Sequence, residues 1–187
     1  MAKSIRLKVT KADQNHDVGT SKFLGYPVIP EEWENEFDES VLFLLQINLK
    51  EIKDLDKENL LPHKGYLYFF LDVSDGVYNL RPRVRYYDGE PVNVIDDFNS
   101  VVDGFEEFVE PYVVEFEECD EYAGGTKLFG SINDQMYADE DRQLLFQFDP
   151  YEPDMGLFPT FDGLLFFFFN KEDPNNFDKV EFTEDFS

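Results

Sequence analysis

The chain has 187 residues, of which 42% are hydrophobic and 17% are aromatic. This composition excludes a mainly disordered chain, and the length suits one domain that buries a sizeable core. The 41 acidic and 16 basic residues give a formal net charge of −25. Nucleic acid and anionic membrane surfaces are therefore excluded as partners, because both carry negative charge.

Taken in chain order, the hydrophobic patterns predict mainly strands. Ser4–Val9 alternates apolar and polar residues, as a half-buried strand does, whereas Tyr66–Leu71 and Leu164–Phe169 are apolar throughout and are expected to be buried on both faces. Pro82 indicates an edge position for its strand. The predicted strands are Ser4–Val9, Phe43–Ile47, Tyr66–Leu71, Val77–Tyr87, Tyr112–Phe116, Leu144–Phe148 and Leu164–Phe169.

Helix is expected to be minor. Leu49–Asn59 places its apolar and lysine residues on separate faces and is the best helical candidate. Lys171–Asn176 is expected to form a single turn because Pro174 interrupts it. The segments between the strands are rich in Pro, Gly, Asn and Asp, which is typical of loops.

Three sequence blocks occur twice in the same order, about one hundred residues apart. Ser21–Gly25 is echoed by Thr126–Gly130. The other two pairs are Phe43–Asn48 with Leu144–Asp149, and Leu61–Phe70 with Phe158–Phe168. We therefore expect one domain, 1–187, with an internal duplication of about 21–73 and 126–170. The predicted fold class is mainly β or α+β, with two β-rich halves packed as one body.

These blocks resemble the YwqG-like family of bacterial proteins, which is a domain of unknown function. The resemblance runs roughly from Ser4 to Phe182 and implies a β-rich cytoplasmic protein without an established activity. The chain departs from the family at Met155–Gly163, where the family often has Met-Trp-Gly-Asp. The matching residues are Ser21, Lys22, Gly25, Pro27, Pro30 and Trp33, then Leu44–Asn48, Leu61, Pro62, Gly65, Leu67, Phe69, Phe70, Leu144, Leu145, Gln147 and Asp149.

The residues that carry metal and nucleophile chemistry are scarce. His16 and His63 are the only histidines, and Cys119 is the only cysteine. No spacing typical of a zinc site occurs, so we expect no metal and no cofactor, and we interpret His63 as a surface turn residue. A free thiol and the lack of a long apolar segment indicate a cytoplasmic protein without a membrane span.

Gln46 and Gln147 interrupt apolar strands at the same point of the repeated unit. A buried amide is unfavourable unless it is hydrogen-bonded. Each glutamine is expected to tie its strand to a neighbouring loop. The alternative is that both line a binding site between the halves, and Trp33 of the first block is a further candidate binding residue.

The acids are concentrated after Arg85. Between Arg85 and Lys127 there are 13 acids and no base. The segment Asp96–Glu121 is therefore predicted to present a negative face to a basic protein partner, with Glu106, Glu107, Glu115 and Glu117 as candidate binding residues.

The working interpretation is a non-enzymatic binding module. One alternative is an acidic immunity-type protein that neutralises a basic toxin. The other is a hydrolase that uses carboxylates of the loop Asp149–Asp162, so the chain is not excluded as an enzyme.

Overall fold

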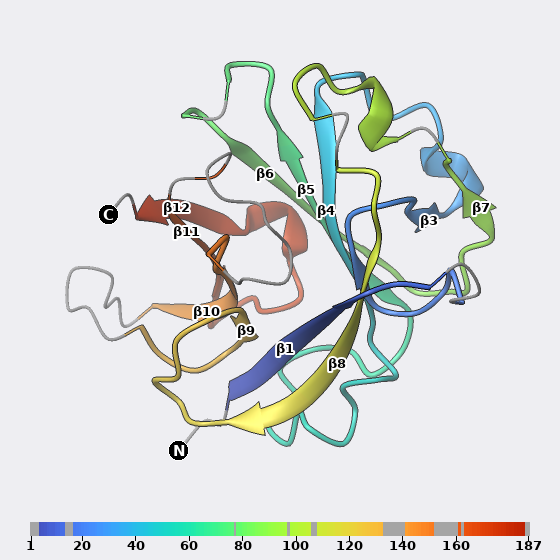
Figure 1. Ribbon diagram of the computed structural model, residues 1–187. Coiled ribbons are helices and arrows are strands. Elements are labelled where there is room, and N and C mark those ends of the chain that lie inside the picture. The colour runs from blue at the N-terminus through green and yellow to red at the C-terminus, as the bar shows by residue number, and fades with distance from the viewer. Residues whose placement is uncertain are drawn as a thin grey trace.

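The computed structural model describes residues 4–13, 17–76, 78–96, 98–105, 108–132, 141–151, 161 and 163–185 (Figure 1). Strands dominate this part of the chain, and the helices within it are single 3-10 turns. The strands are β1 (Ser4–Lys11), β2 (Lys22–Phe23), β3 (Val28–Ile29), β4 (Val41–Asn48), β5 (Tyr66–Asp72), β6 (Arg81–Tyr87), β7 (Asn93–Val94), β8 (Tyr112–Cys119), β9 (Lys127–Leu128), β10 (Arg142–Phe148), β11 (Leu164–Asn170) and β12 (Glu181–Asp185). The 3-10 turns are η1 (Glu31–Trp33), η2 (Asn99–Val101) and η4 (Phe177–Lys179).

Ten strands form one curled sheet in the order β12-β11-β10-β9-β1-β8-β2-β4-β5-β6. The long antiparallel pair β1–β8, from Ser4 opposite Cys119 to Lys11 opposite Tyr112, lies in the middle of this sheet (Figure 1). It joins two groups of strands: the first group is β2, β4, β5 and β6, and the second group is β9, β10, β11 and β12. The edge strands β6 and β12 approach each other, so the sheet nearly closes. The predicted β-rich fold class is confirmed, and β6 with Pro82 is an edge strand as expected.

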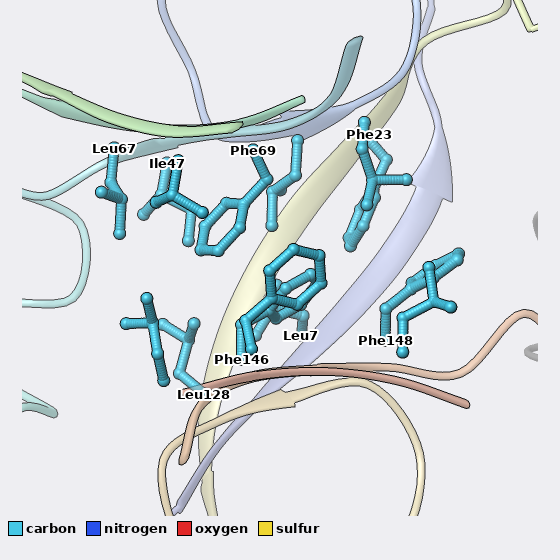
Figure 2. Close-up of a cluster of buried hydrophobic side chains, with 14 of the residues drawn as sticks. Leu7, Phe23, Ile47, Leu67, Phe69, Leu128, Phe146 and Phe148 are labelled. Atoms are coloured by element: carbon cyan, nitrogen blue, oxygen red, sulfur yellow. The ribbon is translucent and has the colours of Figure 1, made fainter. Parts of the chain in front are cut away.

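The main core lies inside the curled sheet. Figure 2 shows Phe23 and Phe69 on one side of it, facing Phe146 and Phe148 on the other. The ring centroids of Phe69 and Phe146 are 4.7 Å apart, and both side chains are fully buried. Burial of such aromatic surface is the main stabilising contribution in a fold of this kind.

A second apolar cluster covers the outer face of β4 and β5. Alternate residues of β5 face opposite ways, so Phe69 lies in the main core while Tyr68 and Phe70 lie in the outer cluster with Trp33. This explains why Tyr66–Leu71 has no polar residue: both faces are covered, as the sequence predicted. β3 and β7 form a separate two-stranded sheet on this side.

The two groups of strands share the same pairing scheme. Lys22 of β2 lies opposite Gln46, and Lys127 of β9 lies opposite Gln147. Both β4–β5 and β10–β11 contain one register shift, between Phe43 and Leu45 and between Leu144 and Phe146. The internal duplication expected from the sequence stays a prediction.

The predicted helix Leu49–Asn59 is wrong. The segment folds as consecutive turns, with the N–H of Leu49 bonded to the carbonyl of Gly65. The buried carboxylate of Asp56 accepts the backbone N–H groups of Leu60 and Leu61. An isolated helix of this length is marginal, so these contacts with residues beyond the segment decide its conformation.

The start of one strand also differs from the prediction. β6 begins at Arg81 rather than at Val77, which lies outside the described residues. The residues before it form a turn in which the N–H of Asn79 donates to the carbonyl of Gly76. The segment 171–176 forms turns, as expected, and η4 follows it.

Truncation of Phe69 tests whether the halves unfold as one body. Phe69→Ala is expected to lower the free energy of unfolding by about 3–5 kcal/mol, because it leaves a cavity between the two groups of strands. Phe146→Ala is expected to cost a similar amount, and the double variant less than the sum, because the two rings are in contact.

Urea denaturation followed by fluorescence and by circular dichroism measures these free energies. Tyr78→Ala is the control, since Tyr78 is 74% exposed and should change stability by less than about 0.5 kcal/mol. Two separate unfolding transitions would contradict a single body.

Candidate functional site

A surface hollow of about 520 Å³ lies beside the first group of strands. One wall is the loop 17–20, which precedes β2, and another is formed by β3, β7 and the residues just before β7. Asn48, Glu51 and Tyr66 line it from β4, the turn after it, and β5. We call this feature the acidic hollow.

The acidic hollow combines negative charge with exposed apolar surface. Asp17, Glu51 and Glu90 contribute carboxylates, and Glu90 forms an ion pair with Lys50. Val92 is 81% exposed, and Val18 and Val94 are 41% and 40% exposed. These valines give the concave surface exposed apolar side chains beside its carboxylates.

Two ionisable side chains of the acidic hollow have shifted pKa values. Burial raises the pKa of Glu51, and a hydrogen bond from the backbone N–H of Ser21 opposes this shift. Burial also raises the pKa of Tyr66 to about 12, so the phenol stays protonated and donates to the carbonyl of Gly19 at 2.9 Å. The pKa of Glu51 is thus raised, and its carboxylate is held by the backbone N–H of Ser21 rather than by a second titratable group.

Buried side chains fix the loop 17–20 from below. The Nε2 of Gln46 donates to the carbonyls of Val18 and Thr20, at 3.0 and 2.8 Å. The ammonium of Lys22 also donates to the carbonyl of Val18, at 3.0 Å. One wall of the acidic hollow is therefore held by bonds from strands of the sheet.

Lys22 has a counterpart in the second group of strands. Both Lys22 and Lys127 are 1% exposed. The ammonium of Lys127 donates to the carbonyls of Glu121 and Ser131, at 3.0 and 2.9 Å. Burial lowers the pKa of each lysine to about 8, because the charged form loses its water. The repeated Ser/Thr-Lys pair in the sequence marks the positions of these two lysines. It did not predict that their amines are buried.

The contacts of the two glutamines are those of ties between strand and loop. Gln46 is fully buried, and its three bonds go to Val18 and Thr20 of the loop 17–20 and to Val28 of β3. Gln147 is 5% exposed and donates to the carbonyl of Gly125 at 2.8 Å. The structure thus places each glutamine within its own half.

Trp33 packs in the outer apolar cluster. Its ring lies edge-on to Tyr68 and Tyr87, with centroids 5.5 and 5.9 Å apart. The guanidinium of Arg85 stacks over the indole at 3.9 Å and pairs with Glu36. Trp33 is 6% exposed, so these contacts explain it as a packing residue.

The acidic segment after Arg85 is partly neutralised by bases that are distant in sequence. Glu117 pairs with Lys8 at 2.7 Å and Glu118 with Lys57 at 2.6 Å. Glu115 is exposed and lies opposite Lys8 across the β1–β8 pair. Glu106 and Glu107 lie outside the described residues, so the predicted negative face stays a prediction.

The structure describes part of the other residues that the sequence singled out for chemistry. Nε2 of His63 lies 3.2 Å from a carboxylate oxygen of Asp56, within the turn where the sequence placed it. Most of the loop Asp149–Asp162, including 152–160, lies outside the described residues. Among the residues that are described, no group of three or more His, Cys, Asp or Glu side chains could hold a metal ion. The same part of the chain contains no helix long and apolar enough to cross a membrane.

The two buried lysines predict a rise of stability with pH. Their pKa is about 8 in the folded state and about 10.4 in an unfolded chain, so the unfolded state binds more protons between these values. The free energy of unfolding should therefore increase from pH 7.5 to pH 9, on the order of 1 kcal/mol for each lysine.

Urea titrations at several pH values measure this dependence. They are made in a Cys119→Ser background, because burial raises the pKa of Cys119 and its titration would oppose the effect. Lys22→Met and Lys127→Met should each remove about half of the slope. A stability that is flat or falls over this range in the parent would show that the amines are not buried as described.

Comparison with known proteins gives one family. No curated protein matches the chain. A family model described as "Domain of unknown function (DUF1963)" matches residues 21–124, which include β2 to β8 and the part of the acidic hollow from Val28 to Val94, but not its loop 17–20. Since this match covers more than half of the chain, the protein belongs to that family of unknown function.

Proposed function

We propose that the protein is a non-enzymatic binding module that docks a basic segment of a partner protein in the acidic hollow. The observation that carries this proposal is the combination of carboxylates and exposed valines around one concave surface. A lysine or arginine side chain would meet the charge of Asp17, Glu51 and Glu90. Apolar neighbours in the same segment would cover Val92 and Val94.

The charge of the whole chain supports the same partner. A net charge of −25 attracts basic molecules from a distance and speeds their encounter. Ion pairs with bases of the first half already engage Glu110, Glu117 and Glu118. The acidic hollow adds apolar contact area to its charge, which favours it as the place of docking.

The immunity-type alternative is compatible with this proposal. A basic toxin would be one such partner, as the immunity-type alternative requires. We also propose that the protein is YwqG-like and lies in the cytoplasm. A reducing compartment suits the free thiol of Cys119.

Charge-neutral replacements in the acidic hollow test the proposal. The probe is a fluorescein-labelled peptide of alternating Arg and Leu, compared with a Glu and Leu peptide of equal length. The variant Asp17→Asn/Glu51→Gln/Glu90→Gln keeps the side-chain shapes and is expected to weaken binding about 10-fold, since each exposed charge contributes up to about 1 kcal/mol. Binding to the parent should also weaken as salt rises.

The matched control moves the same charge change to β8. Glu115→Gln/Glu117→Gln/Glu118→Gln changes the net charge equally and should weaken binding much less. The variant Val92→Ser/Val94→Ser should weaken binding without altering its salt dependence. If the β8 variant loses more affinity than the hollow variant, the acidic segment is the docking surface instead. If the parent binds the basic and acidic peptides equally, the proposed function is wrong.

A further inference from the structure

The side chain of Gln46 bonds to two separate segments of the chain that line the acidic hollow. Its Nε2 donates to the carbonyls of Val18 and Thr20 in the loop 17–20. Its Oε1 accepts the backbone N–H of Val28 in β3, at 3.0 Å. All three of these partners line the acidic hollow, and they come from two separate segments of the chain.

We infer that Gln46 is the positioning residue of the acidic hollow: its amide joins the loop 17–20 to β3 and so holds the hollow in its open, preformed shape. This inference rests on the proposed function of the hollow and goes beyond it, because it assigns the shape of the binding surface to one buried side chain that the ligand does not touch.

Among the described side chains, that of Gln46 bonds both to the loop 17–20 and to β3. Lys22 holds only the carbonyl of Val18, while Asn48 and Tyr66 donate to the carbonyl of Gly19. All of these act on the loop 17–20. The β3 side is reached from the sheet by Gln46 and, through the carbonyl of Val28, by the hydroxyl of Tyr68 at 2.6 Å.

Loss of the Gln46 amide is expected to lower affinity, because the two walls of the hollow would no longer be ordered before the ligand binds. Without the amide, the carbonyl of Thr20 and the N–H of Val28 lose their side-chain partner, and the spacing between the walls is no longer fixed. A ligand must then order both walls as it binds, which lowers affinity even where no ligand contact is lost.

The second half of the chain supplies a matched control. Gln147 occupies the corresponding register position, opposite Lys127 as Gln46 is opposite Lys22. It is also buried within an apolar strand, and it bonds to the carbonyl of Gly125, which does not line the acidic hollow. Removal of either amide should destabilise the protein, but only removal of Gln46 should alter the hollow.

The experiment compares Gln46→Met with Gln147→Met, since methionine preserves length and leaves the net charge unchanged. Affinity for the Arg and Leu peptide is measured at a temperature at which both variants are folded by circular dichroism. Gln46→Met should weaken binding at least 10-fold and Gln147→Met less than 3-fold. Amide hydrogen exchange of Gly19 and Thr20 should accelerate in Gln46→Met alone.

A measurement on the parent keeps the inference testable if Gln46→Met does not fold. Exchange of the Gln46 side-chain NH₂ protons, followed by NMR, should slow when the peptide binds, while that of Gln147 should not change. Equal affinity losses in the two variants, or an unchanged Gln46 signal on binding, would overturn the inference. If the parent does not bind the peptide at all, or if the hollow carboxylates do not matter, the proposed function fails instead.

Discussion

The aromatic contact between the two groups of strands is the constraint on which the rest of the structure depends. The ring centroids of Phe69 and Phe146 are 4.7 Å apart (Figure 2). Phe167 lies against both rings, with centroid distances of 5.2 and 5.4 Å. Neither group could bury its inner face alone, because each is only a few strands wide. Their mutual packing therefore fixes the curl of the sheet and, with it, the position of every loop at its rim.

The acidic hollow depends on this packing through buried polar side chains. Gln46 and Lys22 project from strands held by the core and bond to the loop 17–20. A buried amide or ammonium is unfavourable without partners, so the loop must lie where it can supply its carbonyls. In this way a rigid sheet determines the conformation of a surface loop, and a concave surface is formed without a dedicated helix.

The two halves use the same arrangement with different results. Lys22 and Lys127 are equally buried and have similarly lowered pKa values, and each ends on backbone carbonyls of a neighbouring loop. Within the part of the chain that the structure describes, the first of these loops lines a hollow with carboxylates and exposed valines. The shared element is thus the connection between strand and loop, while the outer residues of the loop decide what each half can bind.

The sequence by itself determined that the chain is β-rich, which strands are buried on both faces, and that Gln46 and Gln147 occupy matching places, because strand periodicity and local repeats are properties of neighbouring residues. The tertiary structure alone decided that Leu49–Asn59 forms turns, since Leu49 and the buried carboxylate of Asp56 bond to residues outside that segment. It also decided that Lys8 neutralises Glu117. Asp17, Glu51 and Glu90 come from three separate segments, so no local pattern could show that they share one hollow. Folding partly offsets the charge segregation along the chain, because antiparallel pairing brings Lys8 beside Glu117.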